Sequence, residues 1–409
     1  MSSAFRSFAF INYRLWFAGT MVSNLGTWMQ RTAQDWIVLT MLTDDDATAV
    51  GVTMALQFGP QLLFAPISGL VVDRMSRRTL LMITQAVQGV LALVLGILTA
   101  TGTVQLWTVF MFAFLLGTTT AFDAPARQTF VSELVPPGYM SNAIALNSTS
   151  FNTARLVGPA IAGVLTVILG AGWVFLINAV TFAATLVVLA LLRSNELTPR
   201  PPPRPVRGGV REGFAYVGSR SDLRLLFFTA LVMGMLGLNF PLFTSTMAKI
   251  AFGEGAGQFG LLTSAIAVGS LLGAIVGARR ERPRLRNIAL AAAGFGIAMV
   301  ASALMPTFWS FALVLPVLGF CSITVLNNTN AYVQTTTDPH LRGRVMSLYI
   351  AVLQGGTPIG APLIGWVANE AGPRWGIAVG SIGGFAPALV AVIWWLMLRR
   401  GLNRTDGMT

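Results

Sequence analysis

The sequence predicts an all-α membrane protein in which twelve transmembrane helices form two pseudo-symmetric bundles of six. Composition, recurring apolar runs and a charged linker in the middle of the chain lead to this prediction. Hydrophobic residues make up 54% of the 409 residues and charged residues only 10%, and the mean hydropathy is +0.69. Soluble proteins carry about 25% charged residues, so we expect this chain to lie in lipid.

Apolar runs of about 20 residues, the length that a helix needs to cross a hydrocarbon core of roughly 30 Å, recur along the whole chain. In the first half, the expected helices cover 15–42, 50–71, 79–100, 105–123, 141–168 and 173–192. In the second half, they cover 223–247, 257–278, 286–305, 307–330, 345–367 and 374–398. The first run is too long for a cleavable signal peptide and lacks a small-residue cleavage site behind it.

Basic residues predict the orientation, because short loops rich in Lys and Arg stay in the cytoplasm. Arginines gather after the even-numbered runs, whereas the opposite loops offer little beyond Lys249 and Arg374. Both termini are therefore expected to be cytoplasmic. The net charge of +12 is dispersed over the inner loops, which fits contact with anionic membrane lipids and does not indicate nucleic-acid binding.

A proline- and arginine-rich segment, Arg200 to Pro205, divides the chain and leads into a run, 206–217, that is typical of a short surface helix. We expect a first bundle at 1–192, a cytoplasmic linker at 193–222 and a second bundle at 223–409. The two halves echo each other at a constant offset, which pairs Pro137 with Pro339 and Gly163 with Gly365. Transporters built from such repeats hold their substrate near the midplane between them.

Two charged residues, Arg31 and Asp35, lie inside the first apolar run. They are four residues apart and therefore project from the same helical face. A charge inside the membrane is costly and by default indicates function. One reading is an ion pair that locks this helix to a neighbour. The other is that Asp35 alternately holds a proton or meets a cationic substrate, because desolvation favours the protonated acid and a nearby arginine favours the charged form.

A third intramembrane charge, Arg155, precedes Gly158, Pro159 and Gly163 in the fifth run. The glycines permit close helix approach, and the proline kinks the helix. Tight packing and a conformational role are both open readings, and Arg155 is expected to be a partner of Asp35.

Polar residues on several apolar runs cannot all face lipid, so we expect them to line a cavity or to bridge helices. They are Asn24, Gln57, Gln61, Asn147, Asn152, Asn239, Asn327, Asn328, Asn330 and Gln354. Trp28 and Trp36 bracket the charged pair of the first run, and aromatic faces near a carboxylate suit hydrophobic organic cations.

The loop between the second and third runs resembles the signature loop of the major facilitator superfamily of secondary transporters. It contains Gly69, Asp73, Arg74, Arg77 and Arg78, with Ser76 at a position where the family usually has glycine. The resemblance implies the major facilitator fold and a conformational switch in which Arg77 reaches Asp123, at the inner end of the fourth helix. Positive-inside anchoring also accounts for Arg74 and Arg78.

Three further runs, 26–36, 122–128 and 147–152, resemble the branch of this superfamily that includes enterobactin exporters and bacterial multidrug efflux proteins, and 155–163 resembles part of an antiporter motif. The resemblance implies a monomeric antiporter of the bacterial inner membrane. It would export amphipathic organic compounds or drugs by alternating access and use the proton gradient through Asp35, tuned by Arg31 and Arg155.

Two alternatives stay open. The cargo could be a siderophore or another anionic metabolite, bound directly by Arg31 and Arg155. The chain could also be a non-transporting membrane sensor or assembly partner that kept the fold. No phosphate-binding loop accompanies the helices, and the single His340 and Cys321 form no metal or nucleophile constellation, so neither an enzyme nor a cofactor is expected.

Overall fold

The computed structural model describes residues 3–197, 210–278 and 283–405, and these residues form helices and no strand. The chain divides into two compact units. Unit 1 is Met1–Pro205 together with Gly253–Ser264, and unit 2 is Val206–Phe252 together with Ala265–Thr409. The predicted bundle boundaries at 192 and 223 stay a prediction, and Arg200 to Pro205 lie outside the described residues.

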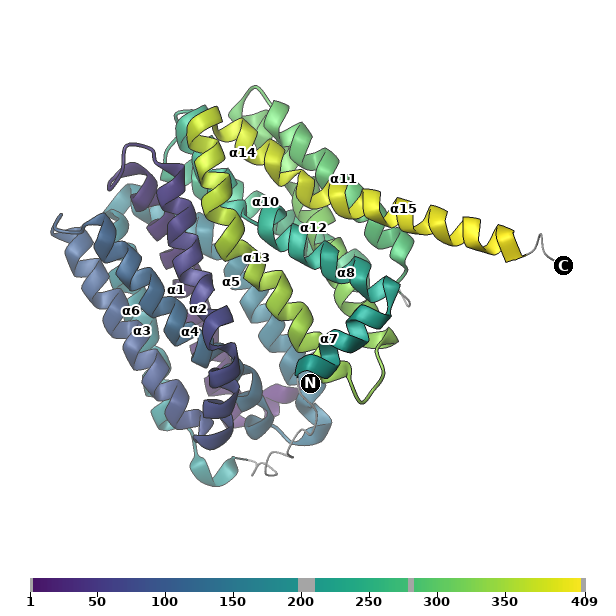
Figure 1. The fold of residues 1–409 in the computed structure, drawn as a ribbon. Helices are drawn as coiled ribbons and strands as arrows, with labels where there is room; N and C mark the ends of the chain where they lie inside the picture. The colour runs from purple at the N-terminus through teal and green to yellow at the C-terminus, as the bar shows by residue number, and fades with distance from the viewer. Residues whose placement is uncertain (1–2, 198–209, 279–282, 406–409) are drawn as a thin grey trace. The chain divides into compact units, whose positions relative to one another are not determined.

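Unit 1 consists of long helices that lie side by side (Figure 1). α3 packs along α6, α2 along α4, and α1 along both α5 and α6. The helices are η1 (Ser3–Ala9), α1 (Ile11–Thr40), α2 (Ala47–Arg74), α3 (Arg77–Ala100), α4 (Leu106–Leu134), η2 (Pro137–Tyr139), α5 (Met140–Leu169), α6 (Ala171–Leu191), η3 (Ser194–Glu196) and the first part of α10 (Ala256–Ala278).

Side-chain caps explain where two of these helices begin. Asp46 precedes α2, and its side chain accepts hydrogen bonds from the backbone N–H groups of Thr48 at 2.7 Å and Ala49 at 3.2 Å. The Ser76 hydroxyl accepts from the Thr79 N–H at 3.2 Å at the start of α3. Serine therefore suits the place where the family usually has glycine.

At one end of unit 1, the helices enclose an apolar core. Trp16 on α1 meets Phe130 on α4 edge to face, with ring centroids 5.1 Å apart, and Tyr13 donates a hydrogen bond to the Ala143 carbonyl of α5 at 2.9 Å. α4 continues to Leu134, well beyond the helix end expected at 123. Asp123 consequently lies within a helix and not at its inner end.

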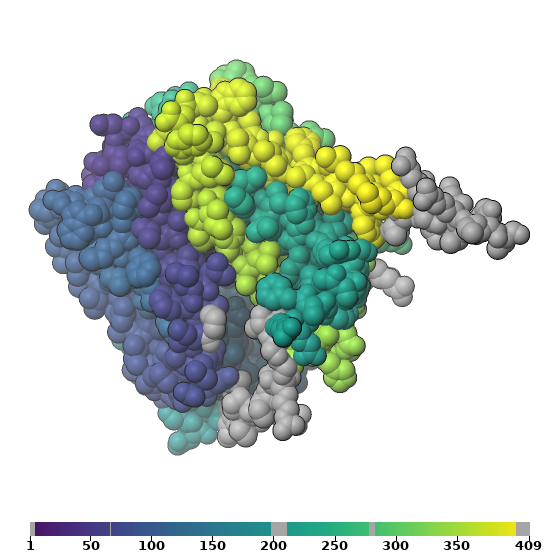
Figure 2. Space-filling model, viewed as in Figure 1, coloured from purple at the N-terminus to yellow at the C-terminus, as the bar shows by residue number. Residues whose placement is uncertain are grey.

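Unit 2 contains several shorter helical pieces. The expected helix over 223–247 is interrupted near Asn239 and Pro241, and the helix expected over 374–398 is divided at Ser381. In Figure 2, α13, α14 and the start of α15 form one continuous surface. The elements are α7 (Val210–Ser219), α8 (Ser221–Val232), η4 (Met233–Gly237), α9 (Phe240–Thr246), η5 (Met247–Ala251), the rest of α10, α11 (Leu285–Leu304), α12 (Phe308–Thr336), α13 (Arg342–Ala371), α14 (Pro373–Gly380) and α15 (Ile382–Thr405).

α7, which falls in the run expected to form a surface helix, packs against one end of α13 (Figure 1). Glu212 on α7 forms an ion pair with Arg344 of α13. Arg220 donates to the Tyr216 hydroxyl at 3.1 Å and pairs with Asp222. The hydrogen bond to Asp222 raises the pKa of Arg220 above its usual range, so this arginine stays charged and ties α7 to unit 2.

Eleven helical segments among the described residues are long and apolar enough to cross a membrane. α1 is not one of them, although it is 30 residues long, because polar residues around Arg31 and Asp35 lower its hydropathy. The chain is an all-α, multi-pass membrane protein. The count of twelve spans is consistent with this structure and stays a prediction for α1.

Candidate transport site

The predicted acid of the first helix, Asp35, is buried in unit 1 with 2% of its surface exposed. Its Oδ1 atom has no hydrogen-bond partner in the described part of the chain. Arg31, one turn earlier on α1, interacts with Asp35 electrostatically, although no ion pair joins the two side chains within the described residues. A buried carboxylate without a direct partner is costly. The ion-pair reading of these two residues is therefore the weaker one.

Arg31 is held between two aromatic rings. Its guanidinium carbon lies 5.3 Å from the ring centroid of Trp28 on α1 and 5.1 Å from that of Phe58 on α2. Both distances fit cation–π attraction. We name Arg31, Asp35, Trp28 and Phe58 the α1 site. Phe58 was not predicted, because nothing in the apolar sequence around it distinguishes it from other phenylalanines.

Trp36 does not bracket the charged pair as expected. It stacks on Phe259 of α10, with ring centroids 5.5 Å apart and an interplanar angle of 18°. On a helix, residue 36 points about 100° away from residue 35, whereas residue 28, two turns earlier, lies on nearly the same face. Flanking in sequence therefore did not mean flanking in space for Trp36. Phe259 was also missed by the sequence analysis.

Arg155, on α5, is half-buried. No hydrogen bond or ion pair joins it to Asp35 among the described residues, so the expected partnership is absent from this structure. Within the part of the chain that the structure describes, Arg31 is the charged group that acts on Asp35. Sequence spacing predicts the depth of Arg155 in the membrane. It does not predict how α5 is rotated about its axis, and so which neighbours the side chain meets.

The glycine motif of α5 is a packing surface for two helices of unit 1. A Cβ at Gly158 would lie 2.8 Å from the Trp28 Cβ, and one at Gly163 would lie 2.6 Å from the Ala256 carbonyl oxygen of α10. A Cβ at Gly260 would collide with the carbonyl of Pro159. Ser264 donates to the Leu156 carbonyl at 2.9 Å. These contacts support the interpretation of the α5 glycines as a tight packing surface. Gly260 on α10, which completes this contact, was not predicted.

The signature loop is held by contacts other than those expected. Arg77 donates to the Thr129 hydroxyl at 3.0 Å and forms an ion pair with Glu133. The predicted pair of Arg77 with Asp123 is wrong, because α4 continues past residue 123. The ten further residues place Glu133 about 15 Å along the helix, at the level of the loop.

Arg78 has a specific role that sequence analysis did not find. Its guanidinium donates to the carbonyls of Leu189 and Ala190, at 2.8 and 2.9 Å, and to the Ser194 hydroxyl at 2.6 Å. These are the last carbonyls of α6, so Arg78 caps that helix. Gly69, Asp73 and Arg74 are exposed at the inner end of α2, and a Cβ at Gly69 would contact nothing within 4 Å.

Asp123 is the centre of a satisfied network. It accepts from the Thr84 hydroxyl at 2.7 Å and the Gln85 amide at 2.8 Å, and it forms an ion pair with Arg127 on its own helix. Arg127 also donates to the Ser23 hydroxyl at 3.1 Å. The four-residue spacing of Asp123 and Arg127 was the available sequence signal for this pair.

The polar residues predicted to line a cavity are scattered. Asn147 bridges helices by accepting from the Tyr13 hydroxyl at 3.4 Å. Gln57 is buried, and its Nε2 atom has no partner in the described chain. Asn152 and Asn328 donate to carbonyls one turn earlier on their own helices. Asn239, in the break between η4 and α9, donates to the Met235 carbonyl of η4, and Asn330 accepts from Gln334. Asn24 and Gln61 are half-buried, and Asn327 and Gln354 are exposed. Their cavity-lining role stays a prediction.

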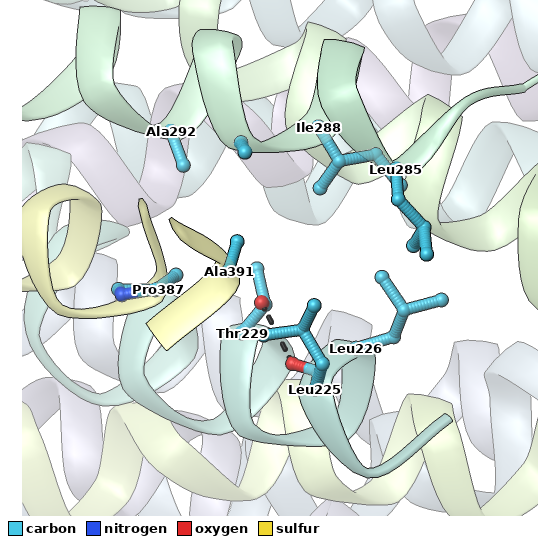
Figure 3. Close-up of a pocket in the computed structure, with 9 residues that line it drawn as sticks. Leu225, Leu226, Thr229, Leu285, Ile288, Ala292, Pro387 and Ala391 are labelled. Carbon is cyan, nitrogen blue, oxygen red and sulfur yellow. Dashed lines mark hydrogen bonds between the residues drawn. The ribbon is translucent and has the colours of Figure 1, made fainter. Parts of the chain in front are cut away.

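A small pocket in unit 2 contains none of the predicted site residues. Figure 3 shows it between apolar side chains of α8, α11 and α15. The Thr229 hydroxyl at its wall donates to the Leu225 carbonyl at 2.9 Å, so it is already satisfied. Within the described residues, no group of three or more His, Cys, Asp and Glu side chains could hold a metal ion.

Comparison with known proteins identifies the family. Residues 2–403 match the family model described as transmembrane secretion effector. The staphyloferrin A transporter of Staphylococcus aureus is 23% identical over 95% of this chain and 96% of its own. The multidrug efflux pump Tap of Mycolicibacterium fortuitum is 26% identical, with 86% and 88% covered, and macrolide efflux protein A of Streptococcus pyogenes is 25% identical, with 88% and 90% covered.

Solved structures of transporters share the fold. The nucleoside transporter NupG aligns with a TM-score of 0.73 at 13% identity, covering 94% of this chain and 99% of that one. A bacterial homologue of the human lysosomal transporter Spinster aligns with a TM-score of 0.72 at 14% identity, covering 96% and 97%. With the family match over nearly the whole length, the chain belongs to the transmembrane secretion effector family of the major facilitator superfamily, whose members are membrane transporters and not enzymes.

Proposed function

We propose that this protein is a proton-coupled antiporter of the bacterial inner membrane that exports amphipathic organic compounds by alternating access. Family membership supports transport of a small molecule across a lipid bilayer. Relatives named for multidrug and macrolide efflux support export. The observation that carries the proton-coupled part is Asp35, a buried carboxylate with an unpartnered oxygen and an arginine one turn away.

The chemistry follows from the α1 site. While Asp35 is shielded from water, its neutral, protonated form costs less than the charged one. When one side of the membrane gains access to the site, water stabilises the carboxylate and the proton leaves. Arg31 favours the charged form at short range. Asp35 can therefore load and release a proton in step with access.

The aromatic pair around Arg31 supplies a place for a cationic cargo. Trp28 and Phe58 already hold a planar cation beside a carboxylate. An organic cation that enters this site would compete with Arg31 for both rings and with the proton for Asp35. Binding of cargo and binding of the proton would then exclude each other, which is the requirement for antiport.

The contact of α10 with α1 and α5 could close the α1 site off from water. Phe259 covers Trp36, the neighbour of Asp35, and Gly163 and Gly260 bring the two backbones together. Separation of this first part of α10 from α1 and α5 would expose the surroundings of Trp36 on α1 to water. The signature loop, with Gly69, Asp73, Arg74, Arg77, Arg78 and Asp123, is proposed as the conformational switch at the cytoplasmic end. We further propose that the protein functions as a monomer with both termini in the cytoplasm. Its two bundles would cover 1–192 and 223–409, with a linker at 193–222.

The experiment is efflux of ethidium, a fluorescent organic cation, from cells that express the wild type, Asp35→Asn or Asp44→Asn. Asp44 is exposed in the loop before α2, so its variant controls for the loss of one acid. Protonophore-sensitive efflux in the wild type and in Asp44→Asn, but not in Asp35→Asn at equal membrane abundance, is expected. Efflux by Asp35→Asn at the wild-type rate would sink the role of Asp35.

An anionic cargo is the second candidate. It is favoured by the half-buried Arg155, which forms no ion pair within the described residues, and by the relative named as a staphyloferrin A transporter. The charge of the cargo decides between the two candidates. Arg155→Ala should weaken binding of an anionic siderophore at least tenfold and leave ethidium unaffected, whereas Asp35→Asn should show the reverse pattern.

A further inference from the structure

A band of buried and half-buried polar side chains runs through the interior of unit 1. Ser23, Gln30 and Gln34 repeat at seven and four residues along α1, so they share one face of that helix. We name the set the polar band. It comprises Ser23, Gln30 and Gln34 on α1, Thr84, Gln85 and Gln88 on α3, Asp123 and Arg127 on α4, and Asn178 and Thr181 on α6.

Direct hydrogen bonds join the band at two levels. At one level, Asn178 donates its amide to the Gln30 Oε1 at 2.5 Å and accepts from the Thr181 hydroxyl at 2.9 Å. At the other, Ser23 meets the Gln85 Oε1 at 3.5 Å, and Gln85 donates to Asp123.

The polar residues of α1 and α3 lie between the two levels and connect them. A rise of 1.5 Å per residue places Gln30 about 10 Å and Gln34 about 16 Å from Ser23 along α1. On α3, Gln88 lies three residues after Gln85, on the same face. The band therefore extends through roughly half the thickness of a hydrocarbon core of about 30 Å. It ends at Gln34, and Asp35 is the next residue of α1, with its side chain about 100° further round the helix, so the last step to Asp35 passes round α1.

Several donors in this band have no acceptor. The Nε2 atoms of Gln30, Gln34 and Gln88 and the Nη1 atom of Arg127 are buried without a hydrogen-bond partner in the described chain. Gln34 is 1% exposed, Gln30 3% and Gln88 5%. Buried polar groups of folded proteins are nearly always paired, and ordered water supplies the partner where protein atoms do not. Four unpaired donors along one band require several such waters.

We propose that the polar band holds a chain of ordered waters that carries protons between Asp35 and the level of Asp123. This inference rests on the proposed role of Asp35 as the proton site. Each step forms one O–H bond and breaks another, so a proton enters at one end as a proton leaves at the other and no further reactant is needed. The amide and hydroxyl groups orient the waters.

The charged groups around the path favour such transfer. Arg31 faces Asp35 from the same helix, and Arg127 is paired with Asp123 at the other end. α3 and α6 contribute only amides and hydroxyls to the band. The interior of the path therefore carries no unpaired cation from α3 or α6 that would repel an excess proton.

Purified protein in proteoliposomes tests the proposal through Gln88→Leu, which replaces an unpartnered donor by an apolar group of similar size. Ethidium transport driven by a pH gradient is expected to fall at least tenfold. Ethidium counterflow at equal pH, which needs no net proton movement, should stay within twofold of the wild type. Gln88→Asn, which keeps the amide, should retain at least half of the driven rate. The matched control is Thr329→Val, which removes an unpartnered buried hydroxyl from α12 and should change neither rate.

An unchanged driven rate in Gln88→Leu, with a wild type that is proton-coupled and dependent on Asp35, would overturn the water path and leave the proposed function standing. A wild type without proton-driven transport would overturn both. If Gln88→Leu does not fold, solid-state NMR of the wild type decides. Magnetisation from water should reach the side-chain amides of Gln30 and Gln88 as fast as it reaches exposed loops, and a transfer as slow as in apolar helix faces would contradict the proposal.

Discussion

Unit 1 contains two buried acids that look alike in sequence and differ in the fold. Asp35 and Asp123 each lie four residues from an arginine on the same helix. Asp123 accepts hydrogen bonds from two side chains of α3 and pairs directly with Arg127. Asp35 keeps an unpartnered oxygen, and its arginine lies between two aromatic rings.

The order of the two residues explains part of the difference. Side chains on a helix lean toward its N-terminus, and a pair with the acid first and the base four residues later is the more favourable order. Asp123 and Arg127 have this order, whereas Arg31 and Asp35 have the reverse. The comparison teaches that one acid is held by its neighbours, while the other is left available for a proton or a cargo.

Loss of Asp123, the acid whose hydrogen bonds are all made, should lower the stability of the fold the most. Asp123→Ala removes a buried acid and leaves the half-buried Arg127 without its counter-ion, and we expect the free energy of unfolding to fall by about 3–5 kcal/mol. Thermal unfolding in detergent and abundance in the membrane measure this loss. The double variant Asp123→Ala with Arg127→Met removes both charges and should recover part of the stability. Equal stability of Asp123→Ala and the wild type would contradict the view that Asp123 has a structural role and Asp35 does not.

The pair of Arg77 with Glu133 extends the same reasoning to the signature loop. Arg77→Ala removes an ion pair and the hydrogen bond to Thr129, and we expect a loss of about 2–3 kcal/mol, the range for hydrogen bonds to charged groups. Glu133→Ala should cost a similar amount, and the double variant should cost less than the sum of the two. Additive losses in this double-mutant cycle would show that the two side chains are not coupled.

Asp35→Asn should change stability far less than Asp123→Ala. It removes a charge that has no direct partner, so we expect the free energy of unfolding to shift by about 1 kcal/mol or less while proton-driven transport is lost. The same unfolding measurements serve here, with Asp44→Asn as the control. A loss of stability as large as that of Asp123→Ala would make Asp35 a structural residue and would contradict the proposed proton site.

Much of the fold could be predicted from the sequence, because lipid imposes a simple rule. Segments such as 79–100 and 141–168 must be helical and apolar to cross the membrane, and the structure has α3 and α5 there within a few residues. Predictions were poorer where a helix extends into water or breaks. Hydropathy could not show that α4 continues to Leu134, nor that polar Asn239 and Pro241 interrupt the seventh apolar run.

The candidate site could be located but not assembled from the sequence. Charges inside apolar runs identified Arg31 and Asp35, since their cost in lipid is evident from composition. Which groups surround them depends on how helices rotate about their axes. Phe58, Phe259 and Glu133 are ordinary residues whose roles come only from packing. Of the expected partners, Trp36 stacks on Phe259, and Arg155 forms no ion pair with Asp35 within the described residues.

The smallest predicted effect concerns Arg78, a charge that is satisfied mainly by backbone carbonyls. Arg78→Met removes the hydrogen bonds to the last carbonyls of α6 but keeps a long apolar stem, so we expect a loss of about 0.5–1 kcal/mol, the usual range for a cation at a helix C-terminus. Arg78→Lys, which keeps the charge, should recover roughly half of it, and high salt should shrink the difference between the variants. Unfolding of the three proteins at low and high salt measures this effect. A loss of unfolding free energy as large as that expected for Arg77→Ala would show that the loop depends equally on both arginines. An arginine bound mainly to backbone carbonyls would then matter as much for stability as one paired with a carboxylate.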